Sequence, residues 1–397
     1  MKIRMIELIL YIFACLKIDL FFTFNLNTMQ KFLFVVALTL LYLTNCEVIR
    51  AAGDAGPTRT RYTFEKGWKF IRSDHTDFSQ LDYDDSRWQS VTVPHDWAVY
   101  GPFSIQNDRQ KVAITQDGQK EAMEHAGRTG GLPFVGVGWY RLDFEVPAFD
   151  RSKKATLVFD GAMSHARVYI NGKEAGYWPY GYNTFYLDVT PYLNAGGKNI
   201  MAVRLENDVE SSRWYPGAGL YRNVHLIVNE DVHIPMWGTQ LSTPVVKNDF
   251  ARVRLNTSLV MPEGKSSSSY RIVTEIKNAV GSVVCKGEKQ LTDFDGQTFS
   301  QEFVVEKPEL WTPDAPYLYT AESKVYEGNV VKDESVTPFG IRSIEIIPNK
   351  GFFLNGKKTV FKGVCNHHDL GPLGAAVNDA AIRRQIRILK DMGCNAI

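Results

Sequence analysis

Residues 363–374, GVCNHHDLGPLG, gather side chains that can do chemistry. His367 and His368 are adjacent, Asn366 precedes them and Asp369 follows. Three consecutive residues rarely converge on one metal ion, and the sequence shows no H-E-x-x-H pattern or distant third ligand. Imidazole N–H groups aimed at hydroxyl oxygens fit a sugar site better than a metal site. We therefore expect a sugar-contacting loop with no metal, and a plain polar turn is the alternative.

The stretch VPHDWAVYGPF (93–103) places His95 and Asp96 between Pro94 and Trp97. A His-Asp pair can belong to a catalytic triad. No G-x-S-x-G elbow accompanies it, and sequence neighbours rarely present both side chains to one substrate. A turn with a buried tryptophan is the favoured interpretation.

The stretch SSRWYPGAGLYRNVHL (211–226) combines large rings with residues that force an irregular path. Arg213 and Arg222 can pair with carboxylates or with the carbonyl groups that such a path leaves free. The rings could stack on a sugar, but packing against a neighbouring domain is the favoured interpretation.

The histidine-containing stretch lies within one predicted βα unit. TVFKGVCN (359–366) predicts a buried strand, and NDAAIRRQIRILKDMG (378–393) predicts a helix that Asn378 or Asp379 can cap and Gly393 can end. One face of this helix is apolar and carries Ile382, Ile386, Leu389 and Met392. Parallel strands need neighbours on both edges, and a (β/α)₈ barrel takes about 250 residues. We expect the first βα unit of an incomplete barrel, in a sequence that is cut short.

The residues before this unit predict β structure. Alternating runs at 154–161, 166–172 and 199–207, with an Asn171-Gly172 turn, predict antiparallel strands. We expect a jelly-roll β-sandwich over residues 56–230, with a long surface loop from Ser104 to Phe134.

A second series of short strands follows at regular spacing. It predicts an immunoglobulin-like β-sandwich over residues 231–344, ahead of the barrel segment at 345–397. The fold class is therefore mainly β, followed by the start of a (β/α)₈ barrel. An Asn355-Gly356 hairpin opens the last segment.

The composition argues against nucleic-acid binding and indicates a packed protein with free thiols. The 397 residues carry a net charge of +1 without a basic block, which removes the electrostatic argument for nucleic acid. Aromatic residues make up 12%, which suits a large β core or sugar-stacking surfaces. Cys285, Cys365 and Cys394 have no regular spacing, and we expect buried free thiols.

Residues 1–52 predict a targeting segment. We expect the start at Met29, and MQKFLFVVALTLLYLTNC from there has a basic residue, an apolar run and then Cys46, in the order of a secretory signal. Cys46 is a candidate for lipidation because its context resembles a bacterial lipobox, and cleavage near Ala52 is the alternative. We expect export, to the periplasm or as a lipoprotein of the outer membrane or cell surface.

Seven stretches, in order, resemble the N-terminal half of glycoside hydrolase family 2, most closely its β-galactosidases. They are VPHDW (93–97), VGWYRLDF (137–144), FDGAMSHARVYINGKEAG (159–176), SRWYPGAGLYRNV (212–224), ELWTPDAPYLY (309–319), FGIRSIE (339–345) and FFLNGKKTVFKGVCNHHDLGPLGAAV (352–377). The resemblance implies a jelly-roll sugar-binding domain, an immunoglobulin-like domain and a catalytic barrel, which are the three parts predicted above from the residue patterns.

The resemblance also implies a chemistry and a partner. Members of the family hydrolyse β-glycosides with retention, using two glutamates on later barrel strands. We expect neither glutamate in this chain, so we assign no catalytic residue and no cofactor, and we expect the chain alone to be inactive. The expected partner is a carbohydrate, with a β-galactoside favoured over a β-glucuronide. A non-catalytic carbohydrate-binding module is the alternative of another class, and a homo-oligomer of the full-length protein stays open.

The resemblance gives the substrate-side residues unequal support. His367 matches a histidine that contacts sugar hydroxyls in similar enzymes, and Asp208 matches more loosely an acidic residue of the jelly roll. His368, Asn366 and Asp96 are weaker candidates. Because Cys365-Asn366 replaces the Asn-Arg of many relatives, the pattern of hydrogen-bond donors cannot be carried over.

Overall fold

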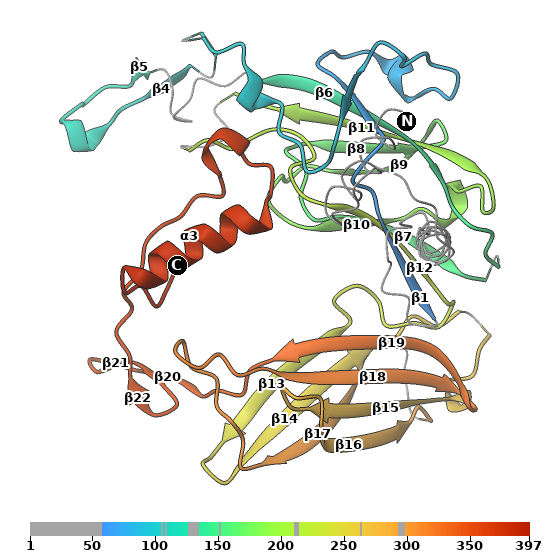
Figure 1. Ribbon diagram of the computed structural model, residues 1–397, viewed down its shortest axis with the longest axis vertical. Coiled ribbons are helices and arrows are strands. Elements are labelled where there is room, and N and C mark those ends of the chain that lie inside the picture. The colour runs from blue at the N-terminus through green and yellow to red at the C-terminus, as the bar shows by residue number, and fades with distance from the viewer. Residues whose placement is uncertain are drawn as a thin grey trace, which may run out of the picture. The chain divides into compact units, whose positions relative to one another are not determined.

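The computed structural model describes residues 58–104, 106–107, 109–125, 135–150, 152–209, 214–262, 264–292 and 298–397 (Figure 1). The expected signal segment, with Met29, Cys46 and Ala52, lies outside these residues. No helix within the described ranges combines the length and apolarity that a bilayer span requires.

The first β domain is a sandwich of two antiparallel sheets. Its strands are β1 (Arg59–Thr63), β2 (Trp68–Ile71), β3 (Gln89–Val91), β6 (Gly136–Glu145), β7 (Lys154–Phe159), β8 (Ala166–Ile170), β9 (Lys173–Trp178), β10 (Phe185–Asp188), β11 (Lys198–Asn207) and β12 (Val224–Asn229). One sheet has the order β1-β12-β7-β10 and the other β3-β2-β6-β11-β8-β9. The three alternating runs expected as strands form β7, β8 and β11, which confirms the predicted jelly-roll sandwich.

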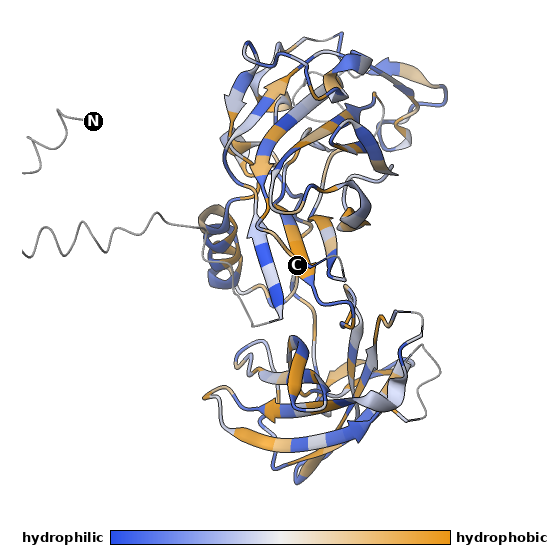
Figure 2. Cartoon of the chain, turned by 90° about the vertical axis from the view of Figure 1, so that its right-hand side faces the viewer, coloured by the Kyte–Doolittle hydropathy of each residue, from blue (hydrophilic) through white to orange (hydrophobic). Residues whose placement is uncertain are grey.

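The core of this sandwich follows from the period-two pattern of its strands. Leu157 and Phe159 of β7 share one buried cluster with Val203 and Leu205 of β11. Successive side chains of a strand point to opposite faces, so alternate apolar residues meet between the sheets. Figure 2 shows apolar and polar segments interleaved along the strands.

The predicted turn between β8 and β9 is confirmed. Asn171 and Gly172 both have positive φ, 51° and 78°, as a type I′ hairpin turn requires. The side-chain NH₂ of Asn171 also donates to the Tyr192 carbonyl at 2.8 Å, which ties the turn to the segment after β10.

A second sandwich follows, as predicted. Its strands are β13 (Thr239–Val246), β14 (Phe250–Ser258), β15 (Tyr270–Lys277), β16 (Val283–Gln290), β17 (Thr298–Glu306), β18 (Tyr319–Glu327) and β19 (Val330–Phe339). They form the sheets β13-β14-β17 and β16-β15-β18-β19, the three-plus-four arrangement of an immunoglobulin-like domain. Strand β17 alternates regularly between buried and exposed side chains, and Phe303 and Val305 point into the core.

The polar segment after Ser104 is more ordered than predicted. Its described residues contain a hairpin of β4 (Gln110–Val112) and β5 (Met123–His125). The predicted long surface loop thus contains a short hairpin that the sequence did not indicate, because strands of three residues are too short to show a period.

The prediction of buried thiols was also wrong. Cys365 is exposed, and Cys285 and Cys394 are only partly covered. Cys285 lies near the edge of its sheet, where its thiol donates to the Val304 carbonyl at 2.8 Å.

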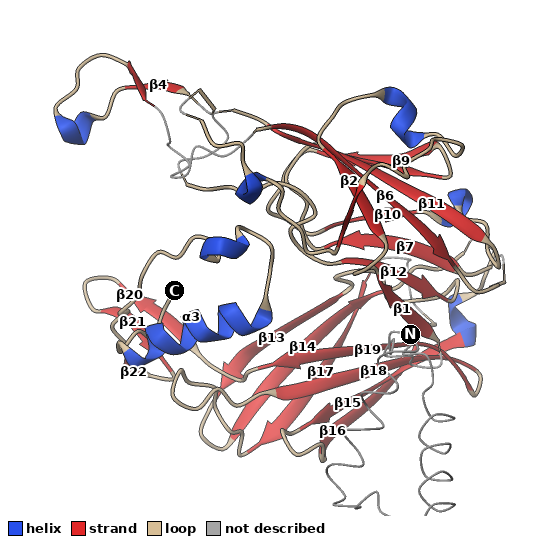
Figure 3. Cartoon of the chain, turned by 45° about the horizontal axis from the view of Figure 1, so that its top comes forward, coloured by secondary structure: helices blue, strands red, loops and turns tan. Residues whose placement is uncertain are grey.

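The C-terminal residues form short strands and a helix (Figure 3). Strands β20 (Ile344–Ile347), β21 (Gly351–Leu354) and β22 (Lys357–Lys358) make a small antiparallel sheet around the Asn355-Gly356 turn. Helix α3 (Asp379–Asp391) begins at Asn378, whose side chain accepts from the Ala381 N–H, and ends before Gly393 with φ 88°. The predicted capping residues are confirmed.

Residues 359–366 differ in part from the buried strand that was predicted. They form no strand and are mostly exposed, and Gly363 pairs with Ala396 in a single parallel bridge. The parallel direction fits a βα unit, but burial of such a strand needs neighbours on both edges and cover on both faces. The described residues therefore do not show a barrel, and that part of the fold class stays a prediction.

Candidate functional site

The candidate site lies where two loops meet. We call residues 364–378, which lead into α3, the histidine loop, and residues 214–223, which lead into β12, the jelly-roll loop. His368 Nε2 donates to the Pro216 carbonyl at 2.8 Å, and the Val377 N–H donates to the Tyr221 carbonyl at 2.9 Å. The favoured interpretation of the jelly-roll loop was packing against a neighbouring domain, and these bonds support it, because they join the loop to the segment 345–397 that was predicted as a separate domain.

Asp96 fastens the two loops together. Its Oδ1 accepts from the backbone N–H groups of Ala98 at 2.9 Å and Ala218 at 3.0 Å. Its Oδ2 accepts from the Tyr215 hydroxyl at 2.7 Å and from the Ala375 N–H at 2.8 Å. With 2% of its surface exposed, this carboxyl group has little contact with solvent.

The surroundings of Asp96 act on its proton affinity in opposite directions. Burial raises the pKa of the Asp96 carboxyl, while the four donors favour its charged form and lower the pKa. Burial, followed by the nearby charge of Asp96, raises the pKa of Tyr215. Because the Tyr215 hydroxyl stays protonated, it remains a donor to Asp96. This geometry gives Asp96 a structural role in fastening the loops, and its predicted contact with substrate stays a prediction.

His368 is held in one tautomer. A carbonyl oxygen only accepts, so the bond to Pro216 places the hydrogen on Nε2 and leaves Nδ1 as an acceptor. Burial lowers the pKa of His368, partly offset by that bond, so the ring is neutral at pH 7. The rings of Tyr182 and Tyr221 lie 5.4 and 5.6 Å from it, centroid to centroid.

His367 is exposed and lies against an aromatic ring. Its centroid is 4.9 Å from that of Trp214, with 48° between the planes. The Trp214 indole N–H donates to the Tyr182 hydroxyl at 3.1 Å, and this bond orients the indole ring. An apolar ring face beside an exposed imidazole and the exposed Asn366 suits a sugar, which presents C–H groups and hydroxyl groups together.

The remaining predicted site residues do not all gather here. Asp208 pairs with His165 instead, with Oδ2 3.1 Å from Nε2. His367, His368 and Asn366 share the histidine loop, and His368 and Asp96 both engage the jelly-roll loop. Arg213 lies outside the described residues, and Arg222 donates to the carbonyl oxygens of its neighbours, as one of the alternatives predicted.

The structure supports a turn rather than a triad at the His-Asp pair of residues 95 and 96. Trp97 is 1% exposed and stacks on Phe70, and His95 Nδ1 lies 2.7 Å from the Tyr140 hydroxyl. Burial lowers the pKa of His95 to about 4, so this ring is neutral at pH 7.

Sequence reasoning missed Tyr182, which contacts both Trp214 and His368. It belongs to YWPYGY (177–182), where rings flank a proline and a glycine. The jelly-roll loop has a similar composition, and this similarity could have indicated that Tyr182 belongs to the candidate site.

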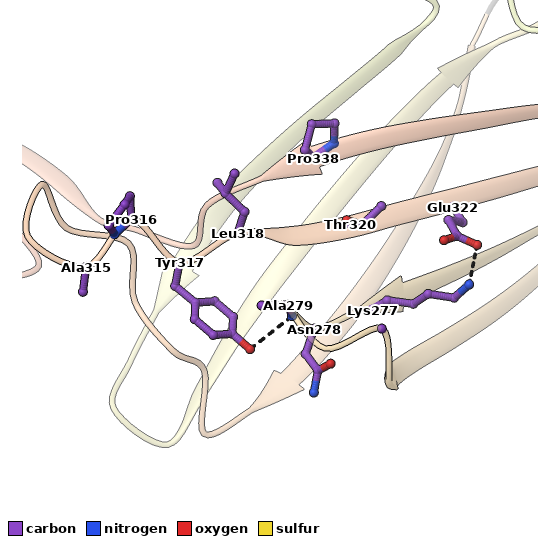
Figure 4. A pocket seen from close by; sticks show the side chains of 11 residues that line it. Lys277, Asn278, Ala279, Ala315, Pro316, Tyr317, Leu318, Thr320, Glu322 and Pro338 are labelled. Atoms are coloured by element: carbon purple, nitrogen blue, oxygen red, sulfur yellow. Dashed lines mark hydrogen bonds and ion pairs between the residues drawn. The ribbon is translucent and has the colours of Figure 1, made fainter. Parts of the chain in front are cut away.

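Two other possibilities, a metal site and a hollow in the second sandwich, have weaker support than this site. The described residues contain no group of three His, Cys, Asp or Glu side chains that could hold a metal ion. A hollow of about 700 Å³ lies in the second sandwich (Figure 4). Its charged side chains, Lys277 and Glu322, pair with each other, and its Tyr317 hydroxyl accepts from the Ala279 N–H. No imidazole or convergent set of unpaired groups lines it.

Two family models match the chain. The sugar-binding domain of glycosyl hydrolases family 2 matches residues 68–229, and a second domain of glycosyl hydrolases family 2 matches residues 232–342.

The similar proteins are glycosidases. Beta-galactosidase BoGH2A of Bacteroides ovatus is 39% identical over 342 residues, which make up 85% of this chain and 38% of the relative. A putative beta-glucuronidase of Formosa agariphila is 32% identical over 374 residues, 94% of this chain and 34% of the relative. The chain thus spans well under half the length of these relatives.

Solved structures agree with these matches. A family 2 glycosyl hydrolase of Bacteroides cellulosilyticus superposes with a TM-score of 0.75 at 32% identity, over 84% of this chain and 42% of the other. A beta-glucuronidase of Bacteroides uniformis gives 0.71 at 27% identity, over 85% and 39%. From two adjacent domain models, two sandwiches and these relatives, we conclude that the chain belongs to glycosyl hydrolase family 2.

Proposed function

We propose that this chain is the substrate-side part of a retaining β-glycosidase that acts on terminal β-galactosides. The observation that carries the proposal is the pairing of the exposed His367 with the Trp214 ring face, where the two loops are fastened together. The ring face would receive the C–H groups of a pyranose while the imidazole bonds its hydroxyl groups. The 39% identity to a beta-galactosidase supports this substrate class.

A β-glucuronide is the second candidate, because several relatives are named beta-glucuronidases. A glucuronide carries a carboxylate, which a cationic side chain would bind best. The nearby Arg222 guanidinium is already directed to the Asp160 and Tyr182 carbonyl groups and lies over the Tyr221 ring. The described part of the jelly-roll loop therefore favours a neutral sugar.

We further propose that the acid/base and nucleophile glutamates lie outside this sequence. The support is that the chain spans 38% of its beta-galactosidase relative. The role left to the present residues is to bind and orient the terminal sugar. Hydrolysis would need the two carboxyl groups about 5–5.5 Å apart that a retaining mechanism uses.

The purified chain can be titrated with methyl β-galactoside and methyl β-glucuronide by NMR. We expect binding of the galactoside, loss of that binding in His367→Ala, and no change in the matched control His125→Ala, which lies on β5. Preference for the glucuronide would overturn the assigned substrate class. With p-nitrophenyl β-galactoside we expect no turnover, and measurable turnover would contradict the placement of the catalytic carboxylates.

A further inference from the structure

A row of aromatic rings continues outward from the candidate site. It begins at His367 and Trp214 and passes to Tyr182, whose ring centroid is 6.4 Å from that of Trp214. It then reaches Tyr180, 5.4 Å from Tyr182 with 56° between the planes. We call these four residues the aromatic row.

The outer end of the row is open to solvent. Tyr180 has 52% of its surface exposed, whereas Tyr182 and Trp214 are partly covered. Leaving a large ring in water forgoes the stabilisation that burial would give it. A ligand that stacks on Tyr180 would recover part of that stabilisation.

The backbone that carries Tyr180 is held on both sides. The Pro179 carbonyl accepts from the His165 N–H at 3.0 Å, and the Gly181 carbonyl accepts from the buried Tyr221 hydroxyl at 2.9 Å. A side chain at Gly181 would clash with Met163, so the turn packs directly on its neighbours. The ring is thus presented from a fixed turn, which lowers the entropy lost when a ligand stacks on it.

The chemistry of the row favours sugar rings over other occupants. Tyrosine and tryptophan side chains are uncharged at neutral pH, so the row offers flat, neutral faces to C–H groups. The row is continuous with the sugar site at His367, so one ligand can occupy both. An acidic peptide or a nucleic acid would instead need cations, which the four residues of the row do not supply.

We propose that Tyr180 and Tyr182 form an outer subsite that stacks the sugar rings beyond the terminal galactosyl unit. The inference rests on the proposed function, and it names the substrate class as an oligosaccharide rather than a small glycoside. Tyr180 makes the outermost contact, so its removal should weaken binding of long ligands alone.

Calorimetric titration of the whole chain with two probes tests the subsite. The probes are methyl β-galactoside and a neutral trisaccharide with a terminal β-galactosyl unit. If one stacked aromatic contact is gained, the trisaccharide should bind about two- to tenfold more tightly than the methyl glycoside. Tyr180→Ala should remove this gain and leave the affinity for methyl β-galactoside unchanged.

Two matched variants separate stacking from general damage. Tyr180→Phe keeps the ring and should keep the gain. Tyr186→Ala removes another exposed tyrosine, which lies beside Trp237, and should also keep it.

Each outcome decides a different point. Equal affinities for the two probes would overturn the outer subsite and leave the proposed function standing. A gain that persists in Tyr180→Ala would also overturn it. Binding of neither probe to the wild-type chain would overturn the proposed function and the subsite together.

Discussion

At the scale of single residues, burial decides what a side chain can do. His95 and Asp96 are types that catalyse reactions elsewhere, yet they are 7% and 2% exposed. His95 faces Tyr140, and Asp96 fastens two loops. His367 has the same imidazole as His95 but is exposed beside Trp214. The difference in environment, and not in residue type, makes His367 the better candidate for contact with a sugar.

The buried His95 predicts a pH dependence of stability. Its pKa is about 4 in the folded chain, against an ordinary value of 6.5. Between these values the unfolded chain binds a proton that the folded chain does not. The free energy of unfolding should therefore fall as the pH drops from 6.5 to 4, by about 3 kcal/mol for this group. Urea unfolding at several pH values measures it.

His95→Asn removes this titration and should flatten the slope by about 1.4 kcal/mol per pH unit within that window. His233 and His368, whose pKa values burial also lowers, should keep part of the wild-type slope. His75→Asn, which replaces a histidine with 60% of its side chain exposed, is the control. An unchanged slope in His95→Asn would show that folding does not lower the pKa of His95.

At the scale of elements, strands and turns were predictable where the signal is local. The Asn171-Gly172 turn and the Asn378 cap depend on residues within four positions of each other. The alternation along β17 directly reflects its two faces. By contrast, the bond between Asp96 and Ala375 joins residues 279 positions apart. No local pattern encodes such a contact, so the role of Asp96 was not predictable.

Two glycines of the histidine loop allow a matched test of this packing. Gly374 and Gly371 both have positive φ, 61° and 65°, so an alanine is strained at either position, and the ψ of −139° at Gly374 adds to the strain there because that combination is almost confined to glycine. A side chain at Gly374 would also clash with Asp96 Oδ2, whereas nothing lies near one at Gly371. Gly374→Ala should therefore lose about 1–3 kcal/mol more than Gly371→Ala in thermal or urea unfolding. Equal losses would mean that the loops bonded to Asp96 accommodate the added methyl group without loss of stability.

At the scale of the whole molecule, the two sandwiches were predictable because each repeats its pattern over many strands. The prediction fails at residues 359–366, where an apolar run indicated a buried strand and the structure shows an exposed segment with a single bridge at Gly363. Val360 and Phe361 are 64% and 60% exposed. Sequence shows that a segment can be buried, but burial itself depends on what packs against the segment.

A partly buried ion pair joins the two sandwiches. The Arg59 guanidinium of β1 donates to both oxygens of Asp333 on β19, at 3.3 and 2.8 Å, and to the Ile234 carbonyl at 2.7 Å. The Asp333 side chain is fully buried and also accepts from the Ile234 N–H. Asp333 therefore joins β1, the segment between β12 and β13, and β19.

Removing one partner of such a pair leaves a charge buried and uncompensated. Arg59→Ala should lower the free energy of unfolding by about 3–5 kcal/mol. Arg59→Lys should recover part of that loss, because an ammonium keeps the charge without the two-pronged geometry. The control is Arg254→Ala, since Arg254 and Glu302 are each 48% exposed, and it should cost at most about 1 kcal/mol. Urea unfolding measures both losses. If Arg59→Ala and Arg254→Ala show the same small loss, the buried pair contributes no more than a surface pair does. The domains are then held together by their apolar contacts.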